Sequence, residues 1–227
     1  MVSTEYLAKE INFDVSNKKL LEEIINYGLN LGADFVEIFL ENTDNISVLV
    51  EEDFITSVSP SFGKGAGIRI FKDKRDGFVS TNDLSKDGLI KSVSQAVQML
   101  DITETSPKGK FQGLEDLRNY SKRKNDWLKK LPSVDEIGDK LLLSTASLKK
   151  DPKVNIRKSS YARNWQQVLI ASSDGTFAKD IRLHQTVGLN LIATEGNIVP
   201  LAVDVLVPQI IQMILEIGIT KKLLMKF

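Results

Sequence analysis

The chain has 227 residues, of which 42% are hydrophobic and 26% are charged, so it can bury a substantial core as a globular protein. Its 30 basic residues balance its 30 acidic residues, and this zero net charge argues against a nucleic-acid-binding protein, which normally shows a basic excess. The absence of cysteine excludes disulfides and thiolate chemistry. Because residues 1–14 lack the apolar core of a signal peptide, we expect a cytoplasmic location.

The segment 16–31 has the pattern of an amphipathic helix, with apolar residues at three- and four-residue steps. Ser16 is a suitable N-cap for this helix and Gly32 a suitable terminator. The segment 35–41 follows with the alternation of a strand. Its valine, isoleucine and leucine residues should point inward.

The other face of that strand carries Glu37 and Glu41. Two carboxylates on one face could form a catalytic pair. We interpret them instead as a solvated strand face, because nothing nearby in the sequence supplies a nucleophile or a metal ligand.

Between residues 45 and 84, alternating apolar runs predict an antiparallel meander of about four strands. The runs are Ile46 to Val50, Phe54 to Val58, Ala66 to Phe71 and Phe78 to Ser80. The breaks between them, at 51–53, 60–61 and 73–77, contain turn residues.

Three glycines in this stretch, Gly63, Gly65 and Gly67, would share one face of a strand. A strip without side chains lets another backbone or a helix approach closely. The alternative is a phosphate-binding loop, but such a loop must open a helix. The sequence IRIFKD that follows is typical of a strand, so we favour the close-packing interpretation.

A second helix is predicted from Asp83 to Leu100, capped by Asn82 or Asp83. It completes a first two-layer unit, residues 1–106. Residues 107–132 are predicted to be a basic connector, in which lysines and arginines cluster around Tyr120 and Trp127. Such a cluster can contact nucleic acid. The balanced net charge favours a solvated connector whose aromatic residues pack onto the domain.

A second unit, residues 133–197, partly repeats the first. A helix is predicted at 133–149, opened by a capping box of Ser133 and Glu136. Strands are predicted at 154–163, 165–172 and 177–193, with a hairpin turn at 173–175. The predicted fold class is therefore α+β (mixed α/β), with two helix-plus-antiparallel-meander units in a two-layer arrangement.

His184 is the only histidine, and it lies within a predicted strand. We interpret it as a structural residue, because a lone strand histidine is rarely a ligand. One histidine and no cysteine cannot assemble the familiar zinc motifs. We therefore predict no catalytic, cofactor-binding or metal-binding residue. A site made only of carboxylates stays open as an alternative, although no feature of the sequence indicates one.

The segment GKGAGIRIFKDKRDGFVSTNDLS, preceded by ITSVS, resembles the N-terminal domain of the TldD/PmbA family of DNA gyrase modulators and zinc metallopeptidases. The similarity extends to LGADFVEIFLE upstream and SSDGTFAKDIRLHQTVGLNLIATEGN downstream. In the family, the resemblance implies a C-terminal domain in which a His-Glu-x-x-x-His helix and a later cysteine hold zinc, which activates water. This chain contains no such motif, so no catalytic residue is carried over.

The resemblance implies that the chain is the non-catalytic N-terminal portion of a TldD-like metallopeptidase, acting in peptide or antitoxin proteolysis and inactive alone. Zinc would belong to the C-terminal domain that this chain lacks. The implied partners are a TldD/PmbA-family subunit and a peptide substrate, without nucleic acid or membrane. The alternative is a stand-alone module that binds a peptide or a partner through its sheets.

Residues 198–227 form an apolar tail of different composition. Pro200, Asp204 and Pro208 argue against a transmembrane helix. One interpretation is an amphipathic helix from about Gln209. The other is a frameshift near Asn197, because A/T-rich codons read in another frame permit a sequence similar to that of the family. The underlying DNA sequence decides between them.

Overall fold

The computed structural model describes residues 17–102, 111–116, 131–147, 154–195 and 198–208. Three helices are present in this part: α1 (Lys18–Asn30), α2 (Lys86–Met99) and α3 (Val134–Ser147). The strands are β1 (Phe35–Glu51), β2 (Phe54–Lys72), β3 (Arg75–Thr81), β4 (Glu115–Asp116), β5 (Val154–Ser172), β6 (Thr176–Glu195) and β7 (Ile198–Pro208).

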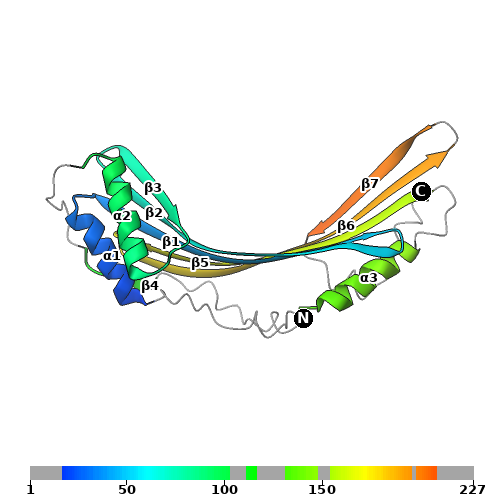
Figure 1. Cartoon of the computed structure of the whole chain (residues 1–227), viewed down its shortest axis with the longest axis horizontal. Coiled ribbons are helices and arrows are strands. Elements are labelled where there is room, and N and C mark those ends of the chain that lie inside the picture. Colours follow the sequence, from blue (N-terminus) through cyan, green and yellow to red (C-terminus); the bar gives the residue numbers. More distant parts are fainter. Residues whose placement is uncertain (1–16, 103–110, 117–130, 148–153, 196–197, 209–227) are drawn as a thin grey trace.

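All of these strands belong to one long, curved sheet, with helices near both of its ends (Figure 1). The strand order is β3-β2-β1-β5-β6-β4, and β7 pairs with β6. Neighbouring strands are antiparallel except for β4 and β6, which are parallel. The α+β fold class is thereby confirmed, and the pairing of β1 with β5 joins the two predicted helix-plus-meander units into a single sheet.

The strands are longer than the sequence predicts. The predicted runs 35–41 and 46–50 are parts of β1, and the runs at 54–58 and 66–71 are parts of β2. The expected break at 60–61 is wrong, because Pro60 lies within β2 opposite Ile46. The expected break at Asn164 is wrong for the same reason, since β5 pairs continuously with β1. Pairing with β1 satisfies the backbone of Asn164, so β5 continues through this polar residue. Pro60 lies in the part of β2 that β3 does not pair with, where a strand tolerates proline.

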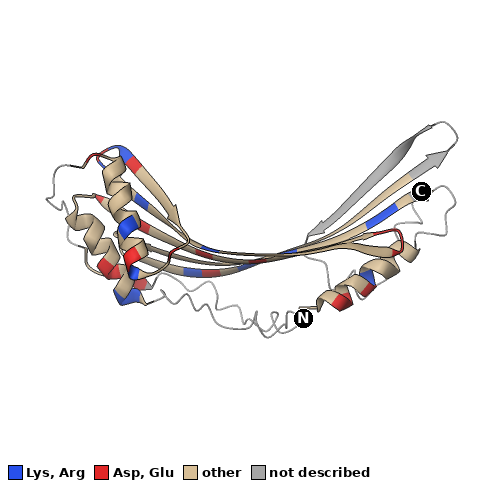
Figure 2. Cartoon of the chain, viewed as in Figure 1, with Lys and Arg blue, Asp and Glu red and all other residues tan. Residues whose placement is uncertain are grey.

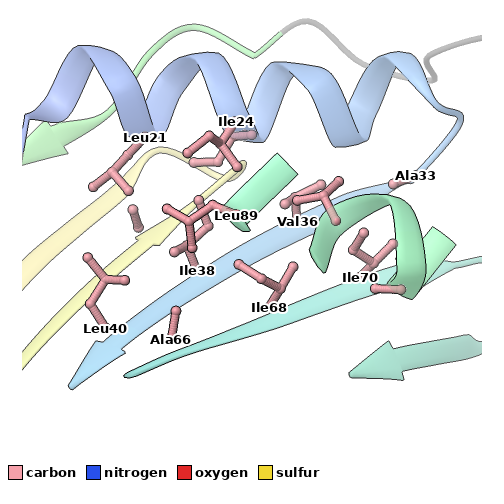
Figure 3. Packing of buried hydrophobic residues seen from close by; sticks show 14 of the residues in the cluster. Leu21, Ile24, Ala33, Val36, Ile38, Leu40, Ala66, Ile68, Ile70 and Leu89 are labelled. Atoms are coloured by element: carbon pink, nitrogen blue, oxygen red, sulfur yellow. The ribbon is translucent and has the colours of Figure 1, made fainter. Parts of the chain in front are cut away.

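One face of the sheet carries all three helices. At one end α1 and α2 cover the inward residues of β1 and β2, as predicted for the 35–41 strand. Figure 3 shows Ile24 and Leu89 over Ile38 and Ile68 in this cluster. At the other end α3 packs its apolar side against a second cluster that includes Val48. The buried apolar residues of β1 are even-numbered at both of its ends, and side chains two residues apart in a strand point to the same side. Both clusters therefore lie on the same face of the sheet.

Local hydrogen bonds set the ends of the helices. Asn17 Oδ1 accepts a hydrogen bond from Lys19 N, 3.1 Å away, at the start of α1, whereas Ser16 lies outside the described residues. Gly32, with φ of 96°, follows the end of α1 as predicted. The predicted start of the second helix at Asp83 is wrong, because Ser85 Oγ caps it by accepting from Gly88 N at 3.1 Å.

The predicted capping box at the start of α3 is confirmed. Glu136 N donates to Ser133 Oγ at 3.2 Å, and Ser133 N donates to Glu136 Oε2 at 2.7 Å. The hairpin turn at 173–175 is also confirmed between β5 and β6, with Gly175 at a φ of 98°.

Two strands were not predicted from the sequence. β4 lies within the expected connector, and β7 lies at the start of the expected apolar tail. The basic cluster around Tyr120 and Trp127, and the helix expected from about Gln209, fall outside the described residues. In the part of the chain that the structure describes, no helix is long and apolar enough to cross a membrane.

Candidate functional site

The face of the sheet opposite the helices offers the most accessible functional groups. We call it the open face. It consists of the odd-numbered residues of β1, from Phe35 to Glu51, and of the residues that pair with them on β2 and β5. It also includes the residues of β6 that pair with those β5 residues. Along β1 these residues are exposed or half-buried, while their even-numbered neighbours are mostly buried under the helices. Within the described ranges, no helix covers this face at its centre (Figure 1).

A depression of about 370 Å³ lies at the centre of the open face. Two adjacent rows of side chains, each crossing four paired strands, line most of it. The first row consists of Ser61, Asn45, Asn164 and His184, and the second of Ser59, Ser47, Ala162 and Thr186. The second row contains only small side chains, which explains why the surface is hollow there.

The amides of the first row are held in place by each other. Asn164 Nδ2 donates a hydrogen bond to Asn45 Oδ1. In the next row, Arg182 Nη1 donates to Gln166 Oε1 at 3.4 Å, and Gln166 Nε2 donates diagonally to Glu41 Oε1 of the row beyond at 2.5 Å. This row of polar contacts borders the depression on one side.

The charged groups near the depression compensate one another. Arg182 Nε lies 2.9 Å from Asp180 Oδ2, and on the same face Lys158 Nζ lies 2.7 Å from Glu51 Oε1. Figure 2 shows both basic and acidic residues along the coloured strands. The two rows therefore present hydroxyls, side-chain amides and one imidazole, a set suited to binding neutral polar groups. Ile46, Pro60 and Arg163 complete the lining of the depression.

The candidate residues from the sequence are found on the open face. Glu37 and Glu41 are half-buried there, and Glu41 accepts the hydrogen bond from Gln166. His184 is exposed and lines the depression. Among the described residues, no group of three histidine, cysteine or acidic residues could hold a metal ion. The zinc that the resemblance implies has no ligand set in this part of the chain.

The glycine strip lies in β2, which confirms the strand and contradicts a phosphate-binding loop at this position. A Cβ at Gly67 would lie 2.9 Å from the ring of Phe78, and one at Gly65 would lie 3.2 Å from the carbonyl oxygen of Thr81. The glycines thus permit the close approach that was predicted, in part to a backbone group.

A second polar cluster lies on the helix-bearing face, between the two apolar clusters. Arg163 Nη2 donates to Asp44 Oδ1 at 3.3 Å, and both side chains are more than nine-tenths buried. In the described structure, Asp44 Oδ2, Arg163 Nε, Trp165 Nε1 and the hydroxyl of Tyr161 have no hydrogen-bond partner. Burial raises the pKa of Tyr161 to about 12. Of these residues, Arg163 also lines the depression. Because the side chains of the cluster are buried, the cluster itself is not a candidate for substrate contact.

Sequence reasoning missed the depression. Its small residues come from four strands, and they meet only because the β1–β5 pairing sets them in register. The sequence features that relate to the depression are the run of serines in β2 and the position of His184 on the polar side of its strand. Without the strand pairing, that signal does not identify a site.

Two family models match separate parts of the chain. Residues 36–100 match PmbA/TldA metallopeptidase domain 1, and residues 129–202 match the PmbA/TldA metallopeptidase central domain. The first range holds β1, β2, β3 and α2, and the second includes α3, β5 and β6. Most of the open face therefore comes from the two matched domains.

Solved structures share the fold. TldE from Thermococcus kodakarensis is 21% identical with a TM-score of 0.68, over 87% of this chain and 46% of that one. A protein described as a candidate modulator of DNA gyrase from Bacteroides thetaiotaomicron is 17% identical with a TM-score of 0.66, over 88% of this chain and 46% of that one. A similarly described protein from Thermotoga maritima is 15% identical with a TM-score of 0.61, over 84% of this chain and 42% of that one.

The chain thus spans less than half the length of these structures. The matches to both domain models, in the order expected and on one continuous sheet, show that the chain belongs to the PmbA/TldD family.

Proposed function

We propose that this chain is the non-catalytic N-terminal portion of a TldD-like zinc metallopeptidase and that its open face contributes to the binding of a peptide substrate. The observation that carries the proposal is the match to the first and central metallopeptidase domains. The site on the open face supports a binding role, because it contains hydrogen-bonding groups on an accessible surface. The chain acts in the cytoplasm, in peptide or antitoxin proteolysis.

The proposal also assigns a partner. A TldD/PmbA-family subunit pairs with this chain, and the likeness to the fold of TldE supports this choice of partner. Neither nucleic acid nor a membrane is a partner. Co-purification of the chain with the TldD- or PmbA-like proteins of its own source organism tests the pairing, with an unrelated protein of similar charge as control.

Peptidase activity is tested with the purified full chain and added zinc. We expect no cleavage of an unstructured peptide above a control that contains zinc alone, because zinc hydrolysis chemistry needs ligands that hold the ion with an open position. Turnover above this control that a chelator abolishes would contradict the assigned non-catalytic role.

The alternative is a stand-alone module that binds a peptide or partner. The open face would bind a peptide or partner in either case, so it does not distinguish the module from the metallopeptidase portion. A reading frame encoding His-Glu-x-x-x-His downstream of this sequence favours the metallopeptidase, whereas its absence favours the module.

A further inference from the structure

We propose that the depression on the open face is a subsite for a short, uncharged segment of an extended peptide that crosses the strands. This inference rests on the proposed peptide-binding function and specifies where the peptide lies, which side chains hold it and what chemistry they select.

The direction of the peptide follows from the two rows that line the depression. The row of small side chains, from Ser59 on β2 to Thr186 on β6, forms a trough perpendicular to the strands. It crosses three strand spacings of about 4.8 Å each, or roughly 14 Å, which is the length of about four residues of extended chain. The volume of about 370 Å³ also suits a short segment, since ligand pockets span roughly 300–1,000 Å³.

The row of side chains beside the trough provides hydrogen-bond partners for a peptide backbone. Asn45, Asn164 and His184 stand side by side in the neighbouring row. A side-chain amide offers donors and an acceptor, as a peptide group does, and an imidazole adds ring nitrogens that can hydrogen-bond. With Asn164 Nδ2 bonded to Asn45 Oδ1, the amide nitrogen of Asn45 and the amide oxygen of Asn164 face the peptide. Ala162, in the floor, presents a methyl group that a small apolar side chain can cover.

The charge of the surroundings selects an uncharged segment. Arg182 is paired with Asp180, and Glu41 accepts from Gln166. Arg163, which also lines the depression, is paired with Asp44, so the charged groups nearest the trough are already engaged. A charged peptide side chain placed in the trough would lose water without gaining an opposite charge to pair with.

The test measures binding of a labelled peptide to the full 227-residue chain by fluorescence anisotropy. The probe is a fluorescein-labelled nonapeptide of alternating serine and valine, compared with peptides in which the central valine is aspartate or lysine. We expect the neutral peptide to bind more tightly than either charged peptide.

Three variants probe the site directly. Ala162→Trp fills the trough and should remove binding of the neutral peptide. Asn164→Ala and His184→Ala each remove one hydrogen-bonding group and should weaken binding by roughly two- to twelve-fold. The matched control is Leu143→Ala, which alters an exposed residue of α3 near the other face and should leave the affinity unchanged. Circular dichroism confirms that each variant is folded.

The outcomes separate the subsite from the broader function. If the neutral peptide binds and all three site variants bind it as tightly as the unmodified chain does, the subsite assignment is wrong while peptide binding stands. If the charged peptides bind as well as the neutral one, the selection for an uncharged segment is wrong. If no peptide binds the chain either alone or with its family partner, both the subsite and the proposed function fail.

Discussion

Replacing Tyr161 with phenylalanine should stabilise the protein, although the residue is almost completely buried. The ring of Tyr161 belongs to the cluster between α3 and the sheet and is 2% exposed, while its hydroxyl has no hydrogen-bond partner in the described structure. Burying a hydroxyl without a partner costs about 1–3 kcal/mol. Phenylalanine keeps the ring in place and removes that group, so we expect the free energy of unfolding at pH 7 to rise by about 1 kcal/mol or more.

Alkaline pH should enlarge this difference. The pKa of Tyr161 is raised from 10.0 to about 12 in the folded protein. Below pH 10 the tyrosine is protonated in both folded and unfolded chains, so its ionisation does not affect stability. Between pH 10 and 12 the unfolded chain loses the proton first, and the folded state loses stability. The loss is about 1.4 kcal/mol at pH 11 and approaches about 2.7 kcal/mol above pH 12.

The assay is urea unfolding followed by circular dichroism at pH 7, 9 and 11 for the unmodified chain and Tyr161→Phe. The difference between the two proteins at each pH cancels the titration of other groups. Tyr27→Phe is the matched control, because the Tyr27 hydroxyl lies 3.1 Å from Ser94 Oγ, and its removal should lower stability by about 0.5–1.5 kcal/mol. The reasoning is refuted if Tyr161→Phe is less stable than the unmodified chain at pH 7, or if the difference does not grow by pH 11.

Two further changes test the packing and the buried ion pair by the same unfolding assay. Gly77→Ala should lower stability by about 1–3 kcal/mol, because its Cβ would lie 2.7 Å from the carbonyl oxygen of Ala96. Gly63→Ala is the control and should have a smaller effect, because its Cβ would meet only a rotatable threonine hydroxyl. Equal losses of stability in the two variants would contradict the packing argument. Asp44→Leu should cost about 3–5 kcal/mol by leaving Arg163 buried without its partner, and adding Arg163→Met should restore most of that loss. A double variant as unstable as Asp44→Leu would show that the unpaired charge is not the cause.

Local signals in the sequence were sufficient for the helices and for several of their ends. The apolar stripe of residues 16–31, the glycine at 32 and the Ser133–Glu136 capping box each depend on neighbours within one or two turns, and the structure contains all of them. The helix starting at Lys86 shows the limit of such signals. Asn82, Asp83 and Ser85 are all acceptable caps by residue type, and the hydrogen bond to Gly88 N selects Ser85.

The lengths of the strands depended on partners that are distant in the sequence. Polar residues such as Asn42 to Asn45 look like a break between two strands, yet they pair with β2 on one side and β5 on the other. A polar residue is acceptable in a strand when both neighbours satisfy its backbone and its side chain faces water or a buried partner, as Asp44 faces Arg163. The sequence does not reveal which partners will be present.

By itself, the sequence determined the alternation of each strand, the glycines that permit close approach and the absence of cysteine. These follow from backbone geometry and side-chain chemistry, which act locally. Only the tertiary structure decided that both halves of the chain share one sheet, and that Ser61, Asn45, Asn164 and His184 form one row beside a trough. Such a site depends on the register between strands more than a hundred residues apart, because a shift of one residue would turn every side chain to the opposite face.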